Sequence, residues 1–219
     1  SRDFVDALPR FQSLGFATIY DIMDDWEGFH GVGQASWWTQ ELEERALQAV
    51  DKVTVVSPVL REKFAHRRTD IRVIANGLRV VSADEKFISS HEENDRCCII
   101  VGYFGHLTDS WFDWEGVLAL AASSDALDIQ IIGYGEPEWV KARVKDVGNI
   151  TLVGFVPADK LASHVANWHI GIIPFKATVL VKAVDPIKIY EYLHFGLPVI
   201  ATGMPHLATY PETQVLESI

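Results

Sequence analysis

The stretch Asp185-Pro-Ile-Lys-Ile-Tyr-Glu-Tyr-Leu-His-Phe-Gly-Leu-Pro-Val-Ile200 decides the fold, because it predicts a helix, a one-residue stop and a buried strand in direct succession. Asp185 is a suitable N-cap, and Pro186 fits the first helical position, where its missing N–H costs nothing. Gly196 is suited to end the helix. The apolar run at 197–201 is typical of a strand that is covered on both faces.

Two opposite charges lie about one turn apart near the start of this predicted helix. They belong to Lys188 and Glu191. A helix start that follows a strand-end loop is a natural anion site, which makes this pair a candidate ligand site. The alternative is an i,i+3 ion pair on a solvated helix face.

The same alternation of strand and helix fills residues 97–219. Strands are predicted at 97–104, 127–132, 149–153, 169–174 and 198–202, with helices at about 114–124, 137–147, 158–168 and 186–195. This order implies an α/β fold with a Rossmann-like parallel sheet and helices on both faces. Such a sheet binds ligands at the carboxyl ends of its strands, where Gly105, Gly133 and Gly154 allow sharp turns or close approach to a ligand.

The N-terminal part predicts a piece of a second α/β domain. Strands are expected at 17–23, 52–57 and 71–75, helices at 37–50 and 58–64, and a flexible glycine-rich loop at 28–33. The polar, acidic run at 80–96 is predicted to be a linker between a domain at 1–79 and one at 97–219. The chain has no initiator methionine and stops soon after the last predicted strand, so we expect a fragment.

Charge and composition narrow the partners. The net charge of −11 over 219 residues argues against nucleic acid or an anionic membrane as the main partner. No apolar run approaches the ~20 residues that span a bilayer. The adjacent Cys97 and Cys98 point to opposite faces of a strand, so neither a disulfide nor a metal pair is expected, and a reducing, cytoplasmic compartment is the default.

A series of motifs resembles the GT-B glycosyltransferases, closest to the retaining, nucleotide-sugar-dependent group that builds bacterial surface polysaccharides. The motifs are Asn76-Gly77, Gly102-Tyr-Phe-Gly105, Gly133-Tyr-Gly135, Gly154-Phe-Val156, Pro186-x-Lys188-x-x-Glu191-Tyr192 and Gly196-x-Pro198-Val199. The resemblance implies two Rossmann-like domains. Residues 97–219 would bind the nucleotide-sugar donor, and residues 1–79 would be the last part of the acceptor domain.

The resemblance also implies donor-binding residues. Glu191 matches the carboxylate that binds the ribose hydroxyls. The family's other motif acid lies eight positions earlier, where this chain has Ala183. Asp185 is the nearby acid, and it stays open between a sugar contact and a helix cap.

The family usually neutralises the donor diphosphate with an Arg and a Lys in the loop after the first donor-domain strand, and this chain has neither there. Lys188 is the favoured replacement, with a surface lysine as its alternative, and Lys182 and Lys176 are further candidates. His106 could donate a hydrogen bond to phosphate, and the amides at Gly105 and at the helix start are further candidates.

The turn at Gly154-Phe155-Val156 resembles the place where backbone groups contact the nucleobase. Phe155 could stack on the base or fill the core. Gly133 belongs to the same set of strand-end turns and is included among the predicted donor-binding residues.

Asp24 and Asp25 follow the strand at 17–23 and are the candidate catalytic residues on the acceptor side. Capping of the following loop is equally plausible, since Asp is common after strands. No Asp-x-Asp pair is present and the family needs no metal for sugar transfer. We therefore expect no metal and no cofactor, with the nucleotide-diphosphate sugar as a substrate.

The sequence thus predicts a glycosyltransferase, cytoplasmic or at the inner membrane face, that moves a sugar from a nucleotide-diphosphate donor to a glycan or lipid-linked acceptor. Any peripheral membrane contact would be made through regions that this chain lacks. The chain alone is expected to bind donor without transferring sugar. A nucleotide-sugar epimerase and a non-catalytic nucleotide-sugar-binding module remain alternatives. A dinucleotide oxidoreductase is disfavoured, because no Gly-x-Gly-x-x-Gly follows a strand.

Overall fold

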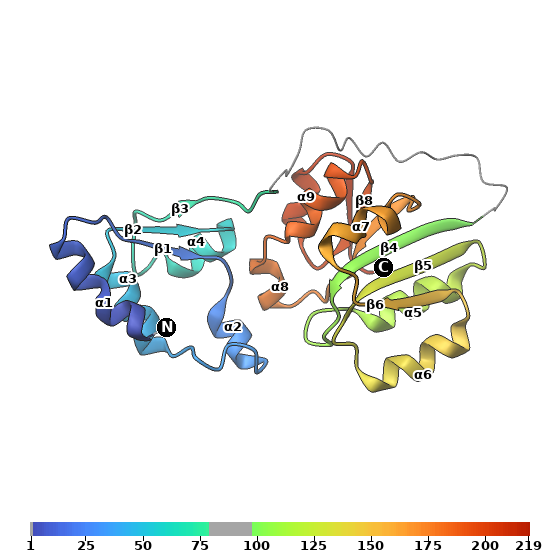
Figure 1. Cartoon of the computed structure of the whole chain (residues 1–219), viewed down its shortest axis with the longest axis horizontal. Coiled ribbons are helices and arrows are strands. Elements are labelled where there is room, and N and C mark those ends of the chain that lie inside the picture. Colours follow the sequence, from blue (N-terminus) through green and yellow to red (C-terminus); the bar gives the residue numbers. More distant parts are fainter. Residues whose placement is uncertain (1, 79–97) are drawn as a thin grey trace. The chain divides into compact units, whose positions relative to one another are not determined.

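The computed structural model describes residues 2–78 and 98–219. The chain forms two compact units (Figure 1). The first unit contains residues 1–76 and 182–185, and the second contains residues 77–181 and 186–219. The predicted linker at 80–96 lies entirely outside the described residues, so the predicted domain boundary stays a prediction.

The first unit is built on a small parallel sheet with the strand order β1-β2-β3. Its elements are α1 (Arg2–Ser13), β1 (Ile19–Ile22), α2 (Trp26–Gly31), α3 (Gln40–Ala49), β2 (Lys52–Val55), α4 (Pro58–Phe64) and β3 (Arg72–Val73). The three strands and the helices α3 and α4 lie where the sequence predicts them.

Side-chain caps explain where these helices begin. Thr39 Oγ1 accepts a hydrogen bond from Leu42 N at the start of α3, and Ser57 Oγ accepts one from Leu60 N at the start of α4. Apolar side chains of the strands and α4 then form the core, among them Ile22, Val53, Val55, Leu60 and Phe64.

The prediction of a flexible loop at 28–33 is wrong for its first part, because residues 26–31 form α2. Asp25 caps this helix by accepting a hydrogen bond from Gly28 N at 3.0 Å. The cap satisfies an amide of the first turn, which offsets the low helix propensity of Gly28 and Gly31.

The second unit is a six-stranded parallel sheet with the order β6-β5-β4-β7-β8-β9. Its elements are β4 (Ile99–His106), α5 (Trp114–Ser123), β5 (Leu127–Tyr134), α6 (Glu138–Val147), β6 (Ile150–Gly154), α7 (Ala158–Val165), β7 (Ile170–Ile173), α8 (Val179–Ala183), α9 (Ile187–His194), β8 (Val199–Thr202), the 3₁₀-helix η1 (Pro205–Thr209) and β9 (Thr213–Leu216). The last two residues of α8 belong to the first unit. The parallel α/β fold with helices on both faces is confirmed.

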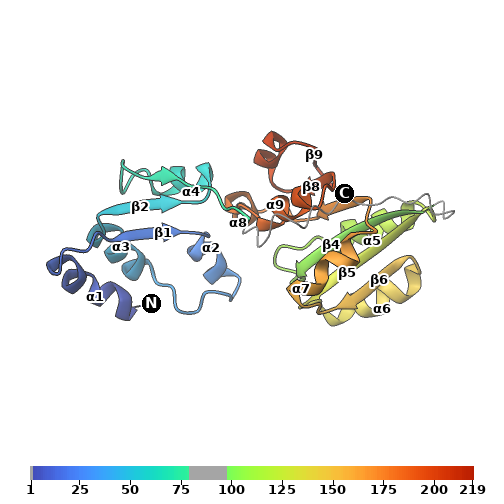
Figure 2. The same cartoon turned by 45° about the horizontal axis from the view of Figure 1, so that its top comes forward.

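The strand order reverses between β4 and β7, because the chain adds β5 and β6 on one side of β4 and then returns to its other side. The helices α5 and α6 accordingly cover one face of the sheet and α7 and α9 the other (Figures 1 and 2). In open parallel sheets the carboxyl ends of the two strands at such a reversal flank a crevice that binds ligands.

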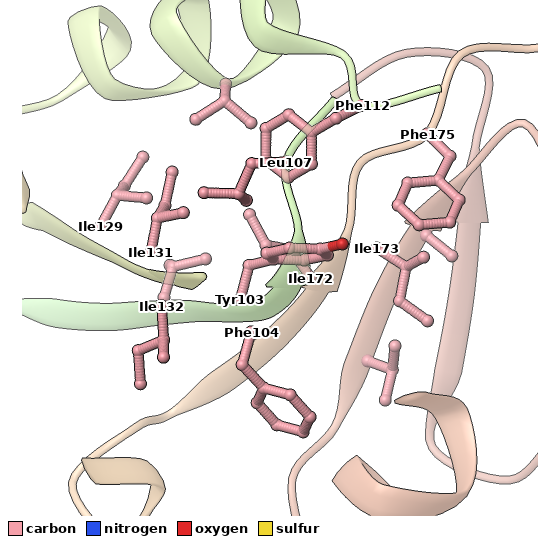
Figure 3. Close-up of a cluster of buried hydrophobic side chains, with 14 of the residues drawn as sticks. Tyr103, Phe104, Leu107, Phe112, Ile129, Ile131, Ile132, Ile172, Ile173 and Phe175 are labelled. Atoms are coloured by element: carbon pink, nitrogen blue, oxygen red, sulfur yellow. The ribbon is translucent and has the colours of Figure 1, made fainter. Parts of the chain in front are cut away.

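The core of this unit lies on both faces of β4. Consecutive side chains point to opposite faces, as Tyr103 and Phe104 show in Figure 3. Tyr103 packs on Phe112 at 4.8 Å between ring centroids, while Phe104 packs on Tyr192 at 5.0 Å. Trp168 is fully buried beside Phe104. The aromatic layers fix the carboxyl end of β4 in place.

The predicted start of the helix at 186–195 is wrong in one respect. Asp185 does not cap α9; Pro186 occupies the N-cap position and makes no side-chain hydrogen bond. The Asp185 carboxylate instead accepts a hydrogen bond from Asn76 N at 2.6 Å, and Asn76 Nδ2 donates to the Asp185 carbonyl oxygen at 2.7 Å. This buried contact within the first unit takes the oxygen that would have capped the helix.

Within the described ranges, no helix combines the length and the hydropathy that crossing a membrane requires.

Candidate functional site

A lysine projects over the carboxyl end of β4 at the reversal of the sheet. Lys188, the second residue of α9, places its Nζ 5.4 Å from the ring centroid of Tyr103 and 6.0 Å from that of Phe175, which follows β7. Aromatic faces attract a cation, so the two rings hold the ammonium group at the strand ends. The alternative of a surface lysine is therefore wrong for Lys188.

Gly105 makes room for this lysine. A Cβ atom on Gly105 would lie 2.5 Å from Lys188 Cε and 2.7 Å from Nζ, and the backbone φ of +141° itself favours glycine. Gly133 is the partner of Gly105 in the β4–β5 register, and a Cβ there would lie 1.8 Å from the Gly105 carbonyl oxygen. Gly133 thus supports the site through close packing of the two strand ends.

Lys188 has no carboxylate within ion-pair distance among the described residues. Burial lowers the pKa of Lys188, and the neighbouring Glu191 offsets this only in part. Burial also raises the pKa of Glu191, with Lys188 acting in the opposite direction. Across the described residues no ion pair joins the two side chains, so the i,i+3 ion-pair alternative is wrong.

His106 ends β4 beside the lysine. Its ring lies 5.4 Å from Trp111 and 5.1 Å from Tyr134, edge-on to the latter. Burial and the charge of Lys188 lower the pKa of His106, which favours the neutral form of the ring. The buried Nδ1 has no hydrogen-bond partner among the described residues, which leaves it available to a ligand. In its neutral form His106 can offer phosphate a hydrogen bond.

The turn after β6 presents an exposed aromatic ring. Phe155 is 71% exposed, and its ring lies 6.2 Å from that of Tyr134 at the end of β5. The core-filling alternative for Phe155 is therefore wrong. Val156 is partly buried against the core. Base stacking by Phe155 stays a prediction.

The other lysines proposed for phosphate are placed differently. Lys176 donates to the carbonyl oxygen of Asp109 at 2.6 Å and to its carboxylate at 2.9 Å. Lys182 belongs to the first unit, as does Asp185. The structure therefore brings together Gly105, His106, Gly133, Lys188 and Glu191 in the second unit, with the Phe155 turn on the neighbouring strand.

Asp24 and Asp25, the acidic pair of the first unit, have different surroundings. Asp25 is buried, caps α2 and forms an ion pair with Lys63 at 2.5 Å, as the loop-capping interpretation predicts. Burial, and then the charge of Asp25, raises the pKa of Asp24 to about 6. Asp24 is the carboxylate of the pair whose titration falls near physiological pH.

Within residues 2–78 and 98–219, no three His, Cys, Asp or Glu side chains gather into a possible metal site.

Residues 99–216, more than half of the chain, match the sequence profile of the family described as glycosyl transferases group 1. The chain belongs to this glycosyltransferase family. The matched segment begins at β4 and ends with β9, so it contains every candidate donor-site residue described above, including Lys182 and Asp185 of the first unit.

One curated relative of this glycosyltransferase is "Putative teichuronic acid biosynthesis glycosyltransferase TuaH" of Bacillus subtilis (strain 168). It is 22% identical over 192 residues, which cover 81% of this chain and 46% of the relative. The chain thus spans about half the length of the curated relative it matches.

Two solved structures resemble the glycosyltransferase chain over nearly its whole length. The apo form of the lipopolysaccharide outer core galactosyltransferase WaaB has a TM-score of 0.68 at 16% identity, covering 97% of this chain and 65% of WaaB. HepE from Anabaena, in complex with UDP and glucose, has a TM-score of 0.65 at 16% identity, covering 99% of this chain and 62% of HepE. The fold expected from the resemblance to GT-B glycosyltransferases is confirmed.

Sequence reasoning missed the two aromatic rings that lie beside Lys188 at the candidate site. Tyr103 and Phe175 hold Lys188, yet each looks like an ordinary core residue next to a strand end. The signal that could have found Phe175 is its position directly after a predicted strand, in the loop that precedes the Lys188 helix. Tyr103 has no comparable signal.

Proposed function

We propose that this chain binds a nucleotide-diphosphate sugar in its second unit and belongs to an enzyme that transfers the sugar to a glycan or lipid-linked acceptor. The observation that carries the proposal is Lys188, a charged group held over two aromatic rings at the sheet reversal without a carboxylate partner among the described residues. Such a group needs an anion, and a diphosphate supplies one.

The neighbouring groups suit the rest of a nucleotide. Glu191 lies one helical turn from Lys188, so its carboxylate can accept hydrogen bonds from both ribose hydroxyls while Lys188 meets the phosphates. The exposed Phe155 ring offers a stacking surface for the base. The solved complexes of HepE with UDP and with UDP-glucose support a uridine nucleotide as the first probe.

In the proposed reaction the bond between the sugar C1 and the diphosphate oxygen breaks, and its electron pair leaves with the diphosphate. The acceptor hydroxyl oxygen forms the new bond to C1 and gives up its proton. Lys188 stabilises the charge that develops on the leaving group, which is the interaction that lowers the barrier. Asp24, ionised above a pKa of about 6, is proposed to bind the acceptor hydroxyl or to take its proton, with Asp25 holding the segment in place.

The proposal also includes the biosynthetic role, the compartment and the cofactor requirement of the enzyme. TuaH is named for teichuronic acid biosynthesis, which supports a role in polysaccharide biosynthesis for this chain too. We propose a cytoplasmic enzyme without metal or cofactor. Because the chain spans about half of that relative, the 219 residues are expected to bind donor without transferring sugar.

The test is calorimetric titration of UDP, GDP, ADP and dTDP into the 219-residue chain and two variants. Glu191→Ala should weaken binding of the preferred nucleotide by roughly 1.5–3 kcal/mol, or about 10- to 150-fold. Glu138→Ala is the matched control, since Glu138 is an exposed acid near the start of another helix of the same unit. No binding of any of the four nucleotides would overturn the proposal, and equal affinity of both variants would remove Glu191 from the site.

A further inference from the structure

The first unit contains a pocket that the donor site does not explain. Its volume is about 190 Å³, and its lining comes from α1, β1, α2, α3 and the segment between α2 and α3. Five aromatic side chains line it, namely Phe4, Tyr20, Trp26, Trp37 and Trp38. The rings of Trp26 and Trp37 meet at 5.2 Å and 59° and form a corner. Trp37 is 49% exposed, which gives the pocket an open aromatic rim.

A buried carboxylate also lines this pocket. Glu43, on α3, is only 3% exposed. Its Oε1 and the indole Nε1 of Trp38 are both buried and have no hydrogen-bond partner among the described residues. Burial raises the pKa of Glu43, while the nearby Trp38 indole and the charges of Lys63 and Arg67 act to lower it. The Trp38 indole and the Glu43 carboxylate act on each other, but neither Nε1 nor Oε1 has a partner within hydrogen-bond distance among the described residues. Ligand oxygens beside the two groups can accept from the indole and donate to the carboxylate, which completes both.

We propose that this pocket binds a single pyranose ring. The apolar C–H face of the ring stacks on the Trp26–Trp37 corner, one hydroxyl donates to Glu43 Oε1, and a second oxygen accepts from Trp38 Nε1. Adjacent hydroxyls of a sugar supply a donor and an acceptor together, which matches the two unpartnered atoms.

The volume fits one ring. A cavity of about 150 Å³ takes up benzene, whereas pockets for drug-sized ligands begin near 300 Å³. The 190 Å³ of this pocket therefore suit one six-membered ring with its hydroxyl groups rather than a disaccharide.

An ammonium ligand is the competing chemistry, because aromatic rings around a carboxylate also attract cations. Two observations disfavour it. Lys63 and Arg67 already act on the Glu43 charge, so a further cation would meet their repulsion. An ammonium group also offers no acceptor to Trp38 Nε1. The inference concerns the first unit and holds whether or not the second unit binds a nucleotide.

Indole N–H resonances of the ¹⁵N-labelled 219-residue chain test the inference directly. The probes are the methyl glycosides of glucose, galactose and N-acetylglucosamine, with choline as the cationic competitor. At least one glycoside should shift the resonances of Trp26, Trp37 and Trp38 with a dissociation constant on the order of 1 mM, and leave those of Trp139 and Trp168 in place.

Matched variants sharpen the result. Trp37→Ala, at a half-exposed site, should weaken binding of that glycoside about tenfold, and Glu43→Gln should weaken it by a similar factor. Trp139→Ala, which removes a partly exposed tryptophan of the second unit, should leave the affinity unchanged. Absence of shifts with every glycoside at about 100 mM, or saturable shifts with choline and none with a sugar, would overturn the inference.

Discussion

Each unit contains a lysine beside a carboxylate, and the two lysines differ in the groups that surround their ammonium nitrogens. Lys63 Nζ lies 2.5 Å from Asp25 and 2.8 Å from Glu27. Burial alone would lower its pKa, but the hydrogen bonds to the two acids outweigh burial and raise it. Lys188 has aromatic rings and a glycine around it instead, and burial lowers its pKa despite Glu191.

The difference distinguishes a lysine that stabilises the fold from a lysine that is available to a ligand. A charge that is satisfied within the protein stabilises the fold, whereas a charge held at a strand end without a partner is available for a ligand. We therefore expect that removal of Lys63 lowers the free energy of unfolding and that removal of Lys188 weakens ligand binding. Four changes test this contrast.

The largest effect is expected from Lys63→Met. The variant leaves the buried Asp25 without its partner, so the free energy of unfolding should fall by about 2–3 kcal/mol, somewhat below the ~3–5 kcal/mol of fully buried pairs. UDP affinity should not change. Urea denaturation measures the loss. Arg143→Met is the control: its ion pair with Glu115 is 51% and 65% exposed. That control should lose less than about 1 kcal/mol. Equal losses in the two variants would contradict the assignment of Lys63 to the fold.

Lys188→Met should do the reverse. UDP affinity should fall by about 1.5–3 kcal/mol, since a hydrogen bond to a charged phosphate is lost, while the free energy of unfolding should not decrease. Calorimetry and urea denaturation report the two quantities. Lys141→Met, at an exposed lysine paired with Glu138, is the matched control. The account fails if Lys188→Met unfolds more easily than the control and binds UDP as the unmodified chain does.

Gly105→Ala tests the space around Lys188. The added Cβ requires the lysine side chain to move, and the φ of +141° adds strain of about 1–3 kcal/mol. Both stability and UDP affinity should therefore fall. Gly148→Ala has similar strain at a φ of +85° but no atom within 4 Å, so only its stability should fall. Unchanged UDP affinity in Gly105→Ala would show that the position of Lys188 is unimportant.

The smallest effect concerns Asp24, the member of the acidic pair that has no lysine assigned to it. Its pKa of about 6 exceeds the ordinary 3.8, so the folded chain binds this proton more tightly than the unfolded chain. The resulting stability is complete below pH 4 and is lost as the pH rises through 6. Asp24→Asn should remove this pH dependence of the free energy of unfolding. The dependence amounts to at most about 3 kcal/mol, and to about 1 kcal/mol once solvent screening is included. Denaturation at pH 4 and pH 7 measures it; parallel curves for the variant and the unmodified chain would refute the raised pKa.

Much of the second unit could be predicted from the sequence, because several of its strands are apolar, β-branched runs that end at or next to a glycine. The strand predicted at 127–132 is β5 at Leu127–Tyr134, and the one at 198–202 is β8 at Val199–Thr202. The helix α8 and the strand β9 were not predicted. α8 lies in a segment of mixed character, and β9 is a short edge strand whose pairing with β8 depends on the tertiary fold.

Long-range contacts explain the remaining differences. Asp185 has the sequence of an N-cap, but Asn76, 109 positions away, takes its carboxylate. The two glycines of α2 predict a loop, and the cap by Asp25 prevails because Lys63 fixes that carboxylate. For the site, the motif predicts Lys188 and Glu191, whereas the rings that support Lys188 emerge only from the folded structure.

The most direct test of the contrast is the pKa of each lysine, measured by NMR of the side-chain Nζ or Cε with and without saturating UDP. The account predicts that Lys188 titrates below the ordinary value of about 10.4 in the free chain and rises when UDP binds, because a nearby anion favours the charged form. Lys63 should titrate above the ordinary value and stay there. A Lys188 pKa that is ordinary in the free chain and unchanged by UDP would contradict the central claim.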